Sequence, residues 1–141
     1  MNKVSGTSSS TRSAVVFFDS GAPITLIPLD ASNHVPLNPP FYDRVQQHHT
    51  TPQAAFIYQT LTADISIVQS GTFFIWDPLA AAVLTDPGLA FGKTLTLRVV
   101  QELDEESDHP GQLVEDPNRA SIDVMLEADA DGFYDLITIA A

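Results

Sequence analysis

The chain of 141 residues contains no cysteine, so disulfide bonds, thiol nucleophiles and thiolate metal sites are excluded. Basic residues are scarce, with 6 Lys and Arg against 18 Asp and Glu, which gives a formal net charge of −12. Binding to nucleic-acid backbones or anionic membranes requires clustered positive charge, so we expect neither as a partner. The charge balance suits a small neutral substrate, a cation or simple solubility.

Long hydrophobic runs are also missing. No stretch approaches the roughly 18 apolar residues of a membrane-spanning helix, and residues 1–12 lack the apolar centre of a signal peptide. We therefore expect a soluble, cytoplasmic protein. The apolar fraction of 44% is ordinary for a globular chain, and the length fits one domain or part of one.

Helix and strand signals alternate in the first third of the chain, which predicts an α/β fold. Residues 5–13 are polar and low in complexity, and we expect them not to pack. A short apolar run then ends at Gly21, as a helix does. Residues 24–29 are almost continuously apolar, which is typical of a parallel strand buried on both faces. Residues 30–38 should form a loop at its carboxyl end, where ligands bind in open α/β sheets.

The rest of the chain predicts further helices and strands. Proline starts and glycine stops indicate helices over about residues 39–49, 51–70 and 77–84. Alternation predicts a strand over residues 94–99. We expect a solvated acidic loop at 102–108, a β-hairpin from 113–114 and 122–126 around a turn at 116–119, and a final helix over 129–139.

Two segments carry a family resemblance: SGAPITLIPLD at residues 20–30 and FIWDPLAAA at residues 74–82. Both resemble stretches of the inosine–uridine preferring nucleoside hydrolases, at about the separation found in that family. The resemblance covers residues 14–141 and implies the C-terminal part of the nucleoside hydrolase fold. That part is a mixed, mainly parallel sheet flanked by helices, with a C-terminal β-hairpin. Residues 1–13 would be a disordered or non-family segment.

The resemblance also implies a chemistry, which is hydrolysis of the N-glycosidic bond of ribonucleosides with the help of Ca²⁺ in a carboxylate cluster. Asp77 matches the family's late calcium-binding aspartate. Trp76 stands where many members have a histidine acid, and tryptophan there resembles the purine-preferring branch, in which an indole stacks on the base. The residues also permit a plainer interpretation. Asp77 before Pro78 suits a helix N-cap, and a lone tryptophan is more often part of a core.

The sequence departs from the family at its start. The N-terminal aspartate motif D-x-D-x-x-x-D-D has no counterpart, and Val4, Ser5 and Gly6 stand where a ribose-binding Glu-x-Asn pair is expected. One carboxylate cannot supply the 6–8 oxygen ligands of Ca²⁺. We therefore expect no complete catalytic set, no tight calcium binding and no nucleoside turnover unless a second chain supplies the N-terminal half.

Other polar residues are weaker candidates. Asn33 and His34 lie in the predicted loop after the first strand, where they could contact a substrate or cap the loop. His48 and His49 are neighbours on a predicted helix and point apart, which favours a surface role. The acids from Asp129 onward imitate part of an EF-hand but lack its helix and its final glutamate. We expect them to cap the last helix instead.

Two rival functions remain open. The chain could be a non-catalytic α/β module, either a truncated relic or an interaction domain. It could also bind a small molecule or sugar at the same strand ends. A truncated sheet exposes an unpaired edge and apolar surface, so we also expect a homo-oligomer.

Overall fold

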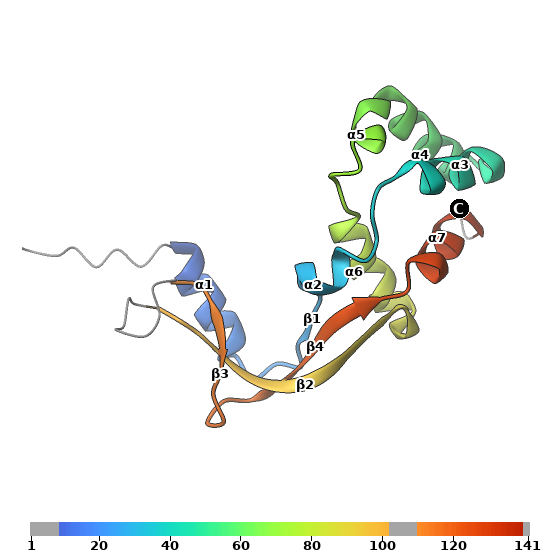
Figure 1. Cartoon of the computed structure of the whole chain (residues 1–141). Helices are drawn as coiled ribbons and strands as arrows, with labels where there is room; N and C mark the ends of the chain where they lie inside the picture. The colour runs from blue at the N-terminus through green and yellow to red at the C-terminus, as the bar shows by residue number, and fades with distance from the viewer. Residues whose placement is uncertain (1–8, 102–109, 140–141) are drawn as a thin grey trace, which may run out of the picture. The chain divides into compact units, whose positions relative to one another are not determined.

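The computed structural model of the chain describes residues 9–101 and 110–139 (Figure 1). Its strands form one mixed four-stranded sheet in the order β1-β4-β2-β3, flanked by helices, which confirms the α/β fold. Two compact units divide the chain, residues 1–26 with 93–124 and residues 27–92 with 125–141. Two of the three boundaries fall within β2 (Ala90–Val99) and β4 (Ser121–Ala128), and the third follows residue 26. None of the helices in the described ranges has the length and apolar character needed to cross a membrane.

The first unit opens with helix α1 (Ser9–Phe18), which starts inside the polar stretch that was expected not to pack. Thr11 is buried there. Strand β1 (Thr25–Leu26) pairs in parallel with β4, with Thr25 opposite Asp123. The prediction of a long strand buried on both faces is wrong, because only two residues pair and Thr25 is exposed. Pro28 lacks an amide hydrogen and leads directly into the next helix, so it ends the strand early.

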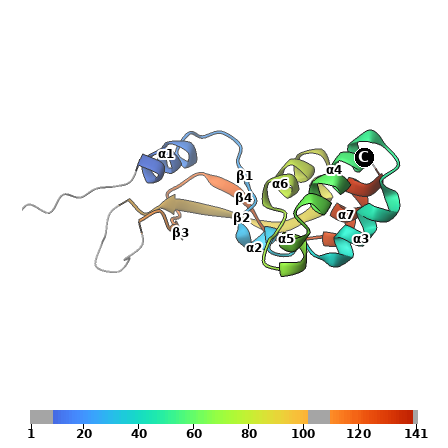
Figure 2. The ribbon, with the colours of Figure 1, turned by 90° about the horizontal axis from the view of Figure 1, so that it is seen from above.

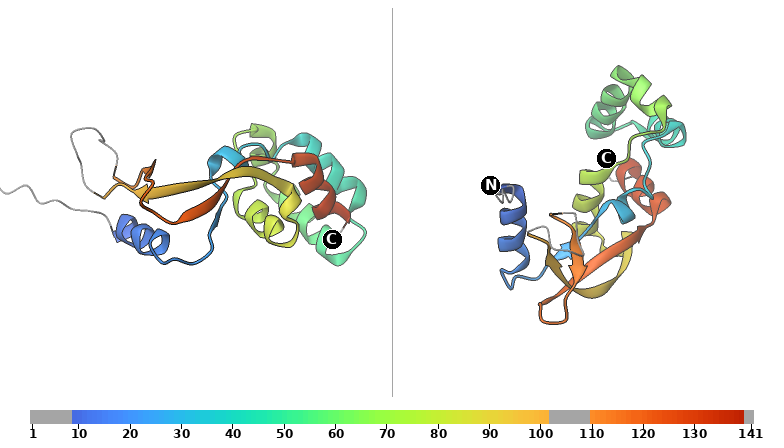
Figure 3. Two further views of the ribbon diagram at one scale, coloured as in Figure 1. Left: turned by 90° about the horizontal axis from the view of Figure 1, so that it is seen from below. Right: turned by 60° about the vertical axis from the view of Figure 1, so that its left-hand side comes forward.

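The predicted hairpin has different partners. Strand β3 (Leu113–Glu115) lies beside β2 (Figure 3). The two strands pair antiparallel, and Val99 faces Leu113 while Leu97 faces Glu115. Strand β4 lies on the other side of β2, so the strands around the turn at 116–119 are not neighbours. The turn itself forms as expected. Its groups are satisfied locally, since the Asp116 carboxylate accepts a hydrogen bond from the backbone N–H of Asn118 at 3.0 Å. Turn chemistry predicts a change of direction, but it does not select the strand that pairs next.

Arg119 joins this turn to the residue that directly follows α1. Its guanidinium lies 2.7 Å from the Asp19 carboxylate and 3.5 Å from that of Asp116. The backbone N–H of Asn118 is the main cause that holds the pKa of Asp116 below its usual range, and Arg119 adds to the effect. The acidic loop predicted at 102–108 lies outside the described residues.

The second unit holds most of the helices. They are α2 (Leu29–Ser32), α3 (Pro39–His48), α4 (Pro52–Ala63), α5 (Ile65–Ser70), α6 (Trp76–Thr85), the 3₁₀ turn η1 (Pro87–Leu89) and α7 (Ala130–Ile139). Within this unit α7 packs against α3 and α6, as Figure 2 shows from above. The core of this unit includes Val35, which lies between α2 and α3, and the helical residues Phe41, Val45, Leu79 and Phe133.

The helix boundaries follow local capping chemistry. Thr51 caps α4 by accepting a hydrogen bond from the backbone N–H of Ala54 at 3.1 Å, as its position before Pro52 predicts. Gly71 ends α5 with a φ of 64°, a left-handed conformation that glycine adopts without strain. The predicted helix over 51–70 is broken at Asp64, however. Its carboxylate accepts a hydrogen bond from the Ser66 hydroxyl, so the side chain competes with the helical pattern.

The last helix is capped by an acid, as predicted. The Asp129 carboxylate accepts a hydrogen bond from the backbone N–H of Gly132 at 3.0 Å. Asp131 pairs with Arg44 of α3 at 2.8 Å, and Asp135 pairs with the same guanidinium at 3.0 Å. The arginine also lies 5.6 Å from the centre of the Tyr134 ring. Both acids that follow Asp129 thus join α7 to α3.

Candidate functional site

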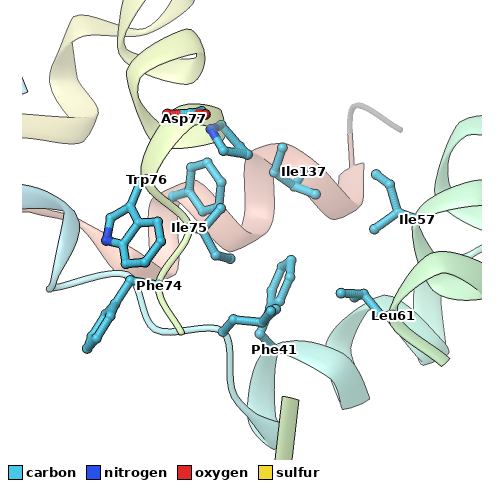
Figure 4. Close-up of a pocket in the computed structure, with 11 residues that line it drawn as sticks. Phe41, Ile57, Leu61, Phe74, Ile75, Trp76, Asp77 and Ile137 are labelled. Atoms are coloured by element: carbon cyan, nitrogen blue, oxygen red, sulfur yellow. The ribbon is translucent and has the colours of Figure 1, made fainter. Parts of the chain in front are cut away.

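A cavity of about 370 Å³ in the second unit is lined in part by Trp76 and Asp77 (Figure 4). Its walls come from α3, α4, α6 and α7 and from the segment before α6. The lining residues are Leu37, Phe41, Ile57, Leu61, Phe74, Ile75, Trp76, Asp77, Pro78, Phe133 and Ile137. Ten of these eleven residues are apolar or aromatic, and Asp77 carries the one charge. The cavity therefore suits a mostly apolar ligand with a polar group at one end.

A short antiparallel bridge fixes the backbone on one side of the cavity. Pro36 lies opposite Phe74, and the carbonyl of Val35 accepts a hydrogen bond from the N–H of Ile75 at 2.9 Å. The N–H of Leu37 donates to the carbonyl of Phe73 at 2.9 Å. Since both ends of the bridge are hydrogen-bonded, the residues that lead into Trp76 are held in place by main-chain contacts.

Trp76 is the first residue of α6 and keeps 42% of its surface exposed. The interpretation of this lone tryptophan as a core residue is therefore wrong. Its indole lies 6.4 Å from the ring of Phe73 and 6.4 Å from that of Phe74, measured between ring centres. An exposed aromatic face at the rim of an apolar cavity is the arrangement that stacking on a planar ligand requires.

Asp77 is exposed and lies in the first turn of α6. The N-cap of this helix is Ile75, so Asp77 does not cap it. A carboxylate in a first turn still interacts favourably with the helix dipole. Within residues 9–101 and 110–139, no hydrogen bond or ion pair joins the Asp77 carboxylate to another group. This leaves the carboxylate at the rim of the cavity available to an external partner.

The described residues do not fit a calcium site on their own. No cluster of three or more His, Asp or Glu side chains that could hold a metal ion occurs in the described part of the chain. Asp77 is the one carboxylate lining the cavity, whereas Ca²⁺ takes 6–8 oxygen ligands. Any calcium bound here would need most of its ligands from outside these residues.

The other predicted polar residues do not line the cavity. Asn33 caps the C-terminus of α2, since its backbone N–H donates to the carbonyl of Leu29 at 2.9 Å, and its side chain is exposed. His34 is exposed and makes a similar backbone contact to Ala31. His48 and His49 are on the surface, as predicted, with the ring of His49 stacked on Tyr58.

Sequence reasoning missed the apolar majority of the site. The lining residues Phe41, Ile57, Leu61 and Phe133 were not predicted as site residues, because helical spacing does not distinguish a residue facing a filled core from one facing a cavity. Phe74 was part of a resembling segment but was not singled out. Its place directly before a helix N-terminus, two residues from Trp76, is the signal that could have identified it.

Tyr134 contacts two segments that contribute residues to the cavity wall. Its hydroxyl donates a 2.7 Å hydrogen bond to the carbonyl of Pro36, and its ring stacks on that of Phe41 with 4.7 Å between ring centres. Burial is the main cause that raises the pKa of this phenol above 10.0, helped by Asp131 and opposed by Arg44. The residue thus joins α7 to the bridge segment and to α3.

We expect Tyr134→Phe to lower the free energy of unfolding by about 1 kcal/mol, because one buried hydrogen bond is lost. The pKa of Tyr134 is higher in the folded chain than in the unfolded chain, so the phenol favours folding below the unfolded pKa. That contribution disappears as the pH rises through the folded pKa. Urea titrations at about pH 8 and about pH 11 should show that the free energies of unfolding of the unchanged chain and of Tyr134→Phe are closer at the higher pH. An equal gap at both values would contradict the role of the phenol's ionisation.

Comparisons with known proteins agree on one family. The sequence profile of the inosine-uridine preferring nucleoside hydrolases matches residues 11–135. Nucleoside hydrolase 3 of Arabidopsis thaliana is 33% identical over 73 aligned residues, which cover 47% of this chain and 8% of the plant protein. The fold is similar to that of a nucleoside hydrolase from Bacillus anthracis, with a TM-score of 0.72, 23% identity and coverage of 91% of this chain and 39% of the bacterial one.

A second solved structure is a purine-preferring ribonucleoside hydrolase from Gardnerella vaginalis, with a TM-score of 0.62 and 25% identity. The match covers 89% of this chain and 41% of that chain. This chain therefore spans less than half the length of each of these solved relatives. The similarity to the C-terminal portion, noted from the sequence, agrees with these partial coverages.

Proposed function

The chain belongs to the family of inosine–uridine preferring nucleoside hydrolases, and from this premise we propose that it forms the base-binding part of a ribonucleoside N-ribohydrolase. The observation that carries the proposal is the apolar cavity with Trp76 and Asp77 side by side at the start of α6. In the proposed reaction, water adds to the anomeric carbon of the ribose, the bond from that carbon to the base nitrogen breaks, and the departing base takes up a proton.

Trp76 has the role of holding the leaving base. The indole face attracts positive charge, so it favours the protonated form of the base over the neutral form. That preference weakens the bond to the sugar without requiring a histidine acid. The resemblance of Trp76 to the purine-preferring branch supports a purine as the base, because a bicyclic base offers the larger stacking surface.

Asp77 has the role of the charged group next to the sugar. Its carboxylate lies at the cavity rim, where it can oppose the positive charge that develops on the ribose. By family resemblance it would also be one ligand of a Ca²⁺ ion. Since the other ligands are not supplied by the described residues, we propose that the isolated chain neither binds Ca²⁺ tightly nor hydrolyses nucleosides.

A polypeptide carrying the N-terminal half of a nucleoside hydrolase would complete the site. The first unit offers a surface for such a partner, because Val16 and Phe17 of α1 are 72% and 55% exposed. Large exposed apolar side chains on one helix mark a surface suited to association. The expected homo-oligomer and the contacts of Asn33 and His34 with substrate stay predictions.

Complementation tests this proposal. The purified chain alone should show no inosine hydrolysis, whereas mixing it with the N-terminal half of a family member should restore activity that EDTA abolishes. Release of ribose, followed with a reducing-sugar assay, is the measurement. Hydrolysis by the chain alone would show that its own residues complete the site.

The lone carboxylate also favours an alternative, in which the chain is a non-catalytic α/β module. A pull-down by an N-terminal half that gives a stable complex without any hydrolysis would support this alternative. The same result would overturn the catalytic proposal.

A further inference from the structure

The cavity has fewer polar groups than a whole nucleoside would need for its hydrogen bonds. A ribose carries hydroxyl groups that need donors and acceptors once they leave water. Among the eleven lining residues only Asp77 offers a charged group, and the indole N–H of Trp76 is the one further polar group on a lining side chain. The cavity of about 370 Å³ lies at the small end of the range for ligand pockets. Its chemistry therefore suits the flat base and offers little to the sugar.

Two rings form the aromatic wall of the cavity. Phe74 and Trp76 lie with their ring centres 6.4 Å apart and their planes tilted by 34°, and both line the cavity. Figure 4 shows the two rings next to each other, with Phe41, Leu61 and Ile57 across from them. A planar heterocycle placed in the cavity meets Phe74 as well as the indole. Because Trp76 is 42% exposed, the polar edge of the base can stay hydrated.

Phe73 provides an internal comparison. Its ring centre also lies 6.4 Å from that of Trp76, and the side chain is 42% exposed, yet it does not line the cavity. The bridge to residues 35–37 holds Phe73 and Phe74 in consecutive positions, so their side chains project in different directions. Only Phe74 is placed to touch a ligand in the cavity.

We propose that this chain binds a free purine base as tightly as it binds the corresponding ribonucleoside, and that Phe74 is a base-binding residue alongside Trp76. The inference rests on the proposed function only in placing the base at Trp76. It goes further by making the base pocket independent of the ribose and of any metal. The pocket would hold the base as part of the nucleoside before bond cleavage and as the free base after it.

The single tryptophan makes a direct test possible, because all indole fluorescence of the full chain comes from Trp76. Stacking of a purine on the indole should quench this emission. The chain is titrated with hypoxanthine, inosine and ribose, with excitation at the red edge of tryptophan absorption, where purines do not absorb. We expect saturable quenching by hypoxanthine and inosine with Kd values that agree within about twofold, and none by ribose.

The two neighbouring phenylalanines supply matched variants. Phe74→Leu should weaken the binding of both purines by about fivefold, because one aromatic contact is lost. Phe73→Leu makes the same chemical change at the same distance from Trp76 and should leave both Kd values unchanged. Both variants keep the main-chain bridge, and circular dichroism with a thermal melt verifies that each remains folded. If Phe74→Leu does not fold, Phe74→Tyr, which keeps the ring, replaces it and should retain binding.

The outcomes separate this inference from the proposed function. Inosine binding about tenfold or more tighter than hypoxanthine would overturn ribose independence and leave the proposed function intact. Equal losses in the two leucine variants, or loss of binding in Phe74→Tyr if it is used, would overturn the role of Phe74. Absence of quenching by either purine in the folded chain would overturn the inference altogether. The proposed function is decided separately by whether complementation with the N-terminal half restores hydrolysis.

Discussion

Inosine hydrolysis by the complemented enzyme should fall by about 100- to 1,000-fold when Asp77 is replaced by asparagine. The substitution keeps the shape of the side chain and one oxygen, but it removes the negative charge. Asp77 supplies the one charge of the cavity lining, and its carboxylate makes no hydrogen bond or ion pair within the described residues. Its loss should therefore act on the reaction and on calcium affinity, with little effect on folding. The rate of ribose release and a calcium titration of the complex are the measurements.

Asp43→Asn is the matched control for that prediction. Asp43 is exposed on α3 and does not line the cavity. Its replacement by asparagine removes the same negative charge as Asp77→Asn does. The activity of Asp43→Asn should stay within about twofold of the unchanged enzyme. An Asp77→Asn enzyme that retains full activity would exclude both the electrostatic role and the metal-ligand role of this carboxylate.

Local chemistry explains which parts of the fold could be predicted. Thr51 and Gly71 mark helix ends through hydrogen bonds and dihedral angles that involve only a few neighbouring residues. The start of α6 was predicted within one residue from Pro78, which suits the first turn of a helix, although Asp77 does not cap this helix. The placement of Trp76 and Asp77 at one cavity depended on the family resemblance, because the alternatives based on sequence alone were a core residue and a helix cap.

The pairing of strands could not be predicted, because it depends on contacts distant in the sequence. The turn at 116–119 forms, yet β3 pairs with β2, and β4 lies between β1 and β2. The cavity could not be predicted from the sequence for a related reason. Phe41 of α3, Leu61 of α4 and Phe133 of α7 meet only after the helices pack, and each alone has the pattern of an ordinary core residue.

Phe133→Ala should lower the free energy of unfolding by about 4 kcal/mol, the largest stability effect that we expect from one substitution. Phe133 is fully buried in the core of the second unit and also lines the cavity, so its ring serves both folding and the pocket. Truncation removes buried apolar surface and enlarges an existing cavity, and few neighbours can move to fill the space. Urea unfolding followed by Trp76 fluorescence measures the change within the same unit.

Two variants decide whether the position or the chemistry of the ring is responsible. Phe56→Ala makes the same truncation on α4 where the ring is 70% exposed, and it should change stability by less than about 0.5 kcal/mol. Phe133→Leu nearly conserves the apolar character and should cost less than about 1.5 kcal/mol. Similar losses for Phe56→Ala and Phe133→Ala would contradict the burial argument. If Phe133→Leu stays folded but binds purines more weakly, the ring at this position shapes the pocket in addition to supporting the core.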